Sequence, residues 1–137
     1  MKILIVTTKS PYPLFEGRAL RTYNLIKQAA LHHEIHLLSF VQTPEDLEGI
    51  EHMRSICKVV EYEKLYFDGA KTQILQDAIC ELFSRAPLPV VKYRTAGMRA
   101  KMRKLMQTHK YDLVHLDMLH LADYIDLCGN TPVALIE

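Results

Sequence analysis

The alternation of short apolar runs with longer amphipathic segments constrains the fold of this chain more than any other feature. Among the first forty residues, the apolar run KILIVTT precedes a loop with two prolines and one glycine, an amphipathic segment over about 18–31, and a second apolar run, EIHLLSF. Strands that are covered on both faces read as near-continuous apolar runs, and apolar residues at helical spacing predict a helix between them. The opening therefore predicts a strand–helix–strand unit of a parallel sheet.

The same alternation continues along the 137 residues of the chain. Strands are expected over 2–8, 34–40, 58–62, 112–116 and 131–137, and helices over 18–31, 44–54, 71–84, 95–108 and 118–127, with a proline-containing linker over 86–89. Since crossovers between parallel strands are right-handed, this order predicts a single α/β domain over 1–137. We expect a three-layer, Rossmann-like fold with a mostly parallel five-stranded sheet in the order 3-2-1-4-5. On the first helix, the expected inward stripe consists of Leu20, Tyr23, Ile26, Ala30 and Leu31.

Composition argues against several classes of protein. The formal net charge of +1 gives no general attraction to nucleic acid or to an anionic membrane, and no apolar run is long enough to span a bilayer. Cys57, Cys80 and Cys128 are odd in number, lie far apart and form no CxxC pair. We therefore expect free thiols in a reducing cytoplasm and no structural zinc site.

The motifs of several nucleotide-binding and catalytic classes are missing. Residues 7–17 contain one glycine, which supplies neither the GxxxxGK[ST] of a P-loop nor the GxGxxG of a dinucleotide site. A phosphate-accepting receiver domain needs acids after its first strand and an aspartate after its third, where this chain has TTK and EYE. A GxSxG nucleophile elbow is also absent, which argues against a small hydrolase.

A set of short motifs follows in a recognisable order and covers nearly the whole chain. The set consists of Tyr12-Pro13, Gly17, Arg21-Thr22-Tyr23, the segment HEIHLL over 33–38, Lys92-Tyr93-Arg94, the segment YDLVH over 111–115, and the segment LHLA over 119–122 with Tyr124. Together these motifs resemble the N-terminal domain of GT-B-fold glycosyltransferases of family 4. The most similar branch is that of the sugar transferases associated with exopolysaccharide export.

The resemblance implies a retaining transferase that moves a sugar from a nucleotide-sugar donor to a polysaccharide or lipid-linked acceptor, in a cleft between two domains. This chain would be the acceptor-side half, and its partner would be a C-terminal Rossmann domain that holds the donor. In the family pattern the active-site histidine would follow Glu137. The resemblance thus implies no catalytic residue within the chain, no activity of the chain alone, and no cofactor besides the donor substrate.

The resemblance also implies roles for the start of the first helix. Gly17 would approach the donor diphosphate, and Arg18 or Arg21 would add positive charge where the helix dipole favours an anion. Arg18 is a departure, since many relatives carry a second glycine or an acid at that place. The alternatives are a glycine that merely starts the helix and a solvated arginine at Arg21.

Acceptor-side candidates lie at strand ends, where ligands of a parallel sheet bind. Tyr12 lies in the first loop, His115 and Asp117 end the fourth strand, His120 follows one helical turn later, and Glu137 ends the fifth strand. Packing of Tyr12 and hydrogen-bonded structural roles for His115, Asp117 and His120 are the alternatives. A metal site is disfavoured because this single cluster at a strand end lacks further ligands.

The fourth expected helix and its flanks carry a basic face, made of Lys92, Arg94, Arg99, Lys101, Arg103, Lys104 and Lys110. This face is either solvated or a contact with anionic lipid headgroups, peripheral to the inner face of the membrane. Nucleic acid is disfavoured because exposed aromatic residues are not interleaved with the basic ones. The alternative to a transferase half is a stand-alone, non-catalytic binding or scaffold module with the same sheet. An uncovered cleft edge would favour self-association.

Overall fold

The computed structural model describes residues 1–14, 17–65, 79, 82 and 93–136. The helix expected over 71–84 lies almost entirely outside the described residues. The linker expected over 86–89, together with Cys80, Lys92 and Glu137, lies wholly outside them.

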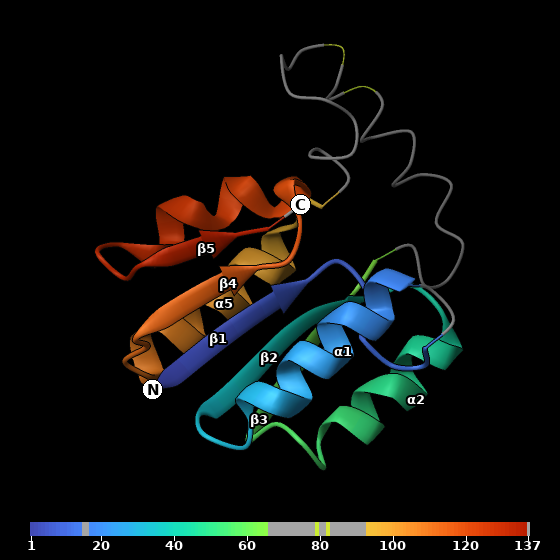
Figure 1. Cartoon of the computed structure of the whole chain (residues 1–137). Helices are drawn as coiled ribbons and strands as arrows, with labels where there is room; N and C mark the ends of the chain where they lie inside the picture. The colour runs from blue at the N-terminus through green and yellow to red at the C-terminus, as the bar shows by residue number, and fades with distance from the viewer. Residues whose placement is uncertain (15–16, 66–78, 80–81, 83–92, 137) are drawn as a thin grey trace.

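A single parallel sheet forms the centre of the structure (Figure 1). Its strands are β1 (Lys2–Thr7), β2 (Glu34–Val41), β3 (Val59–Lys64), β4 (Leu113–Leu116) and β5 (Val133–Leu135). Every strand pair is parallel, and the order is β3-β2-β1-β4-β5. The predicted sheet and its order are confirmed, and the last strand is shorter than the expected 131–137.

Helices cover both faces of the sheet, which gives three layers (Figure 1). On one face lie α1 (Gly17–Ala29) and α2 (Pro44–Met53); on the other lie α5 (Ala96–Thr108) and η1 (Leu119–Cys128). The segment η1 is a 3-10 helix, at the place where a short helix was expected over 118–127. The chain therefore has a Rossmann-like α/β fold, as the sequence predicted.

The alternating side chains of the strands supply two cores. Odd-numbered residues of β1 and β2 face α1 and α2, and even-numbered ones face α5 and η1, because successive side chains of a strand point to opposite faces. The first core includes Ile3, Ile5, Ile26, Leu37 and Ile50. The second includes Leu4, Val6, Phe40, Met98 and Tyr124.

The expected inward stripe of the first helix is partly wrong. Leu20 is 45% exposed and Leu31, which lies beyond the end of α1, is 69% exposed. The buried residues of α1 are Thr22 and Ile26, which are four apart and so lie on one side of the helix. Leu20 is about 200° around the helix from Thr22, given 3.6 residues per turn, and therefore points away from the sheet.

Threonine caps begin α2 and α5, close to the helix starts expected at 44 and 95. The Thr43 side chain accepts a hydrogen bond from the Asp46 backbone N–H, and the Thr43 backbone N–H donates one to the Asp46 carboxylate, which completes a capping box. Thr95 accepts a bond from the Met98 N–H in the same way. These caps fix where each helix leaves its loop.

The two described cysteines, Cys57 and Cys128, are buried free thiols. Burial raises the pKa of Cys57 to about 12 and that of Cys128 to about 11, so both stay protonated at neutral pH. Over the described ranges, no helix is long and apolar enough to cross a membrane.

Candidate functional site

The candidate site lies at the carboxyl ends of β1 and β4, where the order in which the chain adds strands to the sheet reverses. From β1 the chain proceeds outward to β2 and β3, whereas β4 lies on the opposite side of β1 and leads to β5. The connections that leave β1 and β4 therefore diverge, and in such sheets ligands bind in the crevice between them. This is where the sequence placed most of its candidates.

Asp117, which directly follows β4, joins the two sides of this crevice. Its side chain is buried, and its Oδ2 accepts a hydrogen bond of 2.8 Å from the Thr22 hydroxyl on α1. Arg21 Nη2 lies 3.6 Å from Asp117 Oδ1. The Asp117 backbone N–H donates to Val6 O at 3.0 Å. One carboxylate thus ties the first turns of α1 to the end of β4.

His115 and Thr7 contribute two unsatisfied polar atoms beneath this carboxylate. His115 Nε2 is 3.7 Å from Asp117 Oδ1, which is too long for a hydrogen bond. Within the described ranges, His115 Nε2 and Thr7 Oγ1 are the buried side-chain atoms that lack a hydrogen-bond partner. His115 pairs with Ile5 in the sheet, so Thr7, two residues further along β1, points to the same face. Such atoms are rare in folded proteins and often mark functional sites.

A small hollow opens above these groups. It has a volume of about 10 Å³, which is room for about one water molecule. A larger ligand would therefore lie across its mouth. Its lining consists of Thr8, Lys9, Ser10, Pro11, Arg18, Ala19, Thr22 and Asp117.

The surroundings of the hollow suit an anionic group. Lys9 and Arg18 line it, Arg21 lies against Asp117, and α1 begins beside it at Gly17. Backbone N–H groups at a helix start and the helix dipole attract anions. A Cβ built on Gly17 would meet nothing within 4 Å, so this backbone is open to approach. Gly17, Arg18, Arg21 and Asp117 are thus brought together.

Tyr12 packs against α2. Its ring stacks on the His52 ring at 3.9 Å between centroids and an angle of 14°. The Tyr23 hydroxyl lies 3.0 Å from His52 Nε2, which adds α1 to the same contact. Tyr12 therefore holds the first loop to two helices, as its packing interpretation expected.

His120 lies apart from His115 and Asp117. Its ring stacks on Tyr93 at 5.7 Å and 7°, and Tyr93 in turn packs on Phe40 in the core on the α5 face. Across the part of the chain that the structure describes, no three His, Cys, Asp or Glu side chains are arranged to hold a metal ion.

Sequence reasoning missed Thr22, Ser10 and Gly49. Thr22 could have been found as a polar residue four positions from Ile26, on the inward side of the first helix. The Ser10 hydroxyl donates to Tyr12 O at 2.7 Å and shapes the loop. Gly49 lets α2 approach that loop, since its Cβ would be 1.6 Å from Tyr12 O. The approach of Gly49 leaves no pattern in the sequence, because it joins α2 to a loop that is distant along the chain.

Ion pairs occupy much of the basic face on α5. Arg94 pairs with Asp123, Arg99 with Asp126 at 2.6 Å, and Lys101 with Glu63 at 3.0 Å. The hydrogen bonds that Arg94 donates to Asp123 and Arg99 donates to Asp126 raise the pKa of both arginines, and the bond from Arg99 lowers the pKa of Asp126. The pairs hold α5 to η1 and β3. Arg103, Lys104 and Lys110 are exposed.

In comparisons with protein-family models, with curated proteins and with solved structures, the chain matches none of them.

Proposed function

We propose that this chain is the acceptor-side, N-terminal domain of a GT-B glycosyltransferase, which transfers a sugar with retention of configuration from a nucleotide-sugar to a polysaccharide or lipid-linked acceptor. One observation carries the proposal. Residues predicted on two separate grounds lie at one crevice between β1 and β4: Gly17, Arg18 and Arg21 from the roles that the resemblance implies for the helix start, and Asp117 from its place at a strand end.

The chemistry of sugar transfer fits the charges at this crevice. A nucleotide-sugar leaves as a diphosphate, and negative charge builds up on it in the transition state. Preorganised positive groups lower that barrier because they need no rearrangement during the reaction. The open backbone at Gly17 and the guanidinium of Arg18 would face the leaving diphosphate. The second Rossmann domain would supply the nucleotide site and the catalytic histidine.

The test uses the protein encoded by the complete reading frame and the variant Gly17→Val. Since a Cβ at Gly17 meets open space, valine should leave the fold intact while blocking a diphosphate. We expect release of nucleoside diphosphate from a panel of nucleotide-sugars, lost in Gly17→Val at unchanged melting temperature. Equal turnover in both proteins would remove this crevice from the mechanism.

The second candidate is a non-catalytic binding or scaffold module. It is favoured by the internal use of Asp117, whose carboxylate already contacts Thr22 and Arg21. A module of this kind would bind a ligand at the crevice without releasing nucleoside diphosphate. The same assay therefore separates the two functions.

Contact with anionic lipid is a further part of the proposal, because a lipid-linked acceptor lies at a membrane. Only part of the basic face is engaged in ion pairs, and Arg103, Lys104 and Lys110 stay exposed. Each such residue near an anionic surface contributes about 1 kcal/mol at low salt. Sedimentation with anionic vesicles at low salt should carry the protein down, and neutral vesicles should not. Equal recovery with both would exclude this contact.

A further inference from the structure

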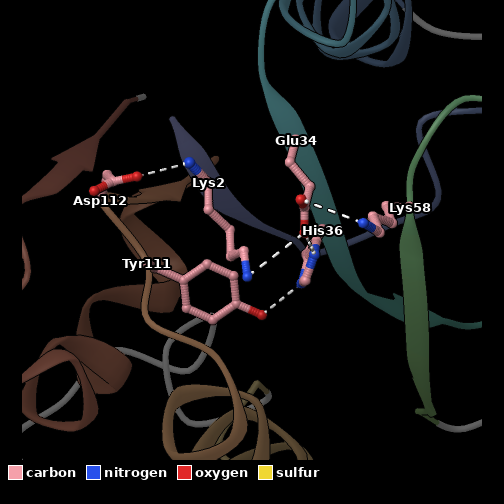
Figure 2. Close-up of polar contacts among 6 residues, drawn as sticks. All are labelled: Lys2, Glu34, His36, Lys58, Tyr111 and Asp112. Atoms are coloured by element: carbon pink, nitrogen blue, oxygen red, sulfur yellow. Dashed lines mark hydrogen bonds and ion pairs between the residues drawn. The ribbon is translucent and has the colours of Figure 1, made fainter.

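A buried histidine lies at the amino-terminal edge of the sheet, opposite the candidate site. His36 on β2 has no exposed surface. Its Nδ1 is 2.8 Å from the hydroxyl of Tyr111, and its Nε2 is 2.8 Å from Oε1 of Glu34. Figure 2 shows the ring between these two partners. Tyr111 belongs to the connection between α5 and β4, so the ring links that connection to β2.

The partners fix how the protons are arranged. An ionised carboxylate only accepts hydrogen bonds, so Nε2 carries a proton and donates it to Glu34. In the neutral ring Nδ1 is then an acceptor, and the Tyr111 hydroxyl donates to it. Burial raises the pKa of Tyr111, which keeps this donor proton in place. All three polar groups are satisfied when His36 is neutral.

Protonation of the ring breaks this arrangement. Both nitrogens of a charged histidine are donors, so Nδ1–H would need the Tyr111 oxygen as its acceptor and the hydroxyl proton would have to turn away from the ring. In the described part of the chain, the Tyr111 hydroxyl has His36 as its hydrogen-bond partner and no second acceptor. Tyr111 is 4% exposed, so water cannot readily replace the lost bond. The charged ring therefore leaves the buried hydroxyl proton of Tyr111 without an acceptor, which weakens this contact.

The charges around His36 determine how readily it accepts a proton. Burial is the main cause that lowers its pKa below the ordinary 6.5; nearby His109 and Lys2 also lower it, and Glu34 raises it. The Glu34 carboxylate is shared between His36 and two lysines, since Lys2 Nζ and Lys58 Nζ lie 3.7 and 3.5 Å from it (Figure 2). The His109 ring meets the His36 ring edge-on, with 4.6 Å between the two ring centroids. Neutral His36 is thus the form that the fold selects.

The geometry points to an acid-operated clasp: neutral His36 holds the connection between α5 and β4 against β2, and its protonation deprives the Tyr111 hydroxyl of its acceptor and loosens that connection. The clasp involves none of the crevice residues and goes beyond the proposed function. Asp112, next to Tyr111, accepts a 2.8 Å bond from the Lys2 backbone N–H, so the same connection also contacts the start of β1 (Figure 2).

The sign of the pH dependence follows from the direction of the pKa shift. Because the folded state binds the His36 proton less tightly than the unfolded chain, this contribution to stability is complete above about pH 6.5 and is lost as the pH falls below it. Glu34 has a lowered pKa, chiefly through its bond with His36, so its contribution is lost only below about pH 4.5. The clasp therefore opens first, in mild acid.

An NMR titration of the wild-type protein from pH 8 to pH 4.5 tests the clasp directly. We expect His36 to show the Nε2–H tautomer at pH 8 and to titrate below pH 6.5. The amide signals of Tyr111 and Asp112 should move with the same midpoint. The clasp is excluded if His36 is charged at pH 7, or if these amides do not follow its titration.

The variant Tyr111→Phe separates a clasp from a merely buried histidine. Without the Tyr111 hydroxyl, the neutral ring loses the hydrogen bond that stabilises it over the charged ring. The midpoint of the His36 titration should therefore rise by about half a pH unit, a roughly threefold change in proton affinity. Tyr62→Phe is the matched control, because Tyr62 packs on the opposite face of the sheet. An unchanged or lower midpoint in Tyr111→Phe would overturn the proposal, and the wild-type titration stands whether or not the variant folds.

Discussion

Asp117 joins α1 to the end of β4, so replacing its side chain should lower the stability of the fold. In Asp117→Ala the buried Thr22 hydroxyl loses its acceptor and Arg21 loses its counter-charge. We expect the free energy of unfolding to fall by about 1–3 kcal/mol, measured by urea denaturation. Asp117→Asn keeps an oxygen for Thr22 and should cost less, and exposed Glu48→Gln should cost almost nothing. Equal stability of all three variants would contradict the joining role.

Two glycines should respond oppositely to the same substitution. A Cβ at Gly49 would lie 1.6 Å from Tyr12 O and 2.5 Å from Ser10 Oγ, so alanine must displace the loop that leads to the site. We expect Gly49→Ala to lower the unfolding free energy by about 1–3 kcal/mol. Gly17→Ala meets open space within a helix and should be neutral or stabilising by up to about 1 kcal/mol. Thermal melts of both variants check this contrast, and similar effects would refute it.

At the scale of the element, the start of α2 is fixed by a capping box rather than by extensive burial. Thr43 accepts from the Asp46 N–H, and Asp46 bonds the backbone N–H groups of Gln42 and Thr43. We expect Thr43→Ala to cost about 1 kcal/mol of unfolding free energy, with faster amide exchange in the first turn of α2. Thr108→Ala, at the exposed end of α5, is the control. If the control costs as much as Thr43→Ala, the cap does not stabilise the helix.

The elements also show where sequence reasoning works and where it stops. The sheet order was predictable because parallel strands need right-handed crossovers and buried strands read as apolar runs. The helix starts at Thr43 and Thr95 were predictable because capping is local in sequence. The inward side of α1 was predicted wrongly because the apolar residues favoured a stripe through Leu20, whereas the buried side carries Thr22, which bonds to Asp117, 95 residues away.

The same limit applies to the candidate site. Asp117 was found because the carboxyl end of β4 follows from the order of the strands, and Arg21 was found through the family resemblance. His120 was grouped with them by its spacing, yet its ring stacks on Tyr93 in a different contact. The close approach of Gly49 to the first loop depends on how α2 packs, which no local pattern records.

At the scale of the whole molecule, the account depends on the crevice between β1 and β4 as the place where an anionic ligand binds. The basic groups near it, at Lys9, Arg18 and Arg21, belong to the first loop and the first turns of α1, whereas the basic face of α5 lies on the other side of the sheet. A ligand bound at the crevice would shift the amide signals of the first loop and α1, whereas a ligand bound at the basic face would shift those of α5. One NMR spectrum therefore distinguishes the two binding sites.

The most direct measurement is therefore an NMR titration of the chain with inorganic pyrophosphate, repeated with Arg18→Ala and with the control Arg103→Ala on α5. The account predicts saturable shifts at Gly17–Thr22 and Asp117 that weaken in Arg18→Ala and persist in Arg103→Ala. Shifts confined to α5, or equal binding by Arg18→Ala and the wild type, would contradict the assignment of the crevice as the ligand site.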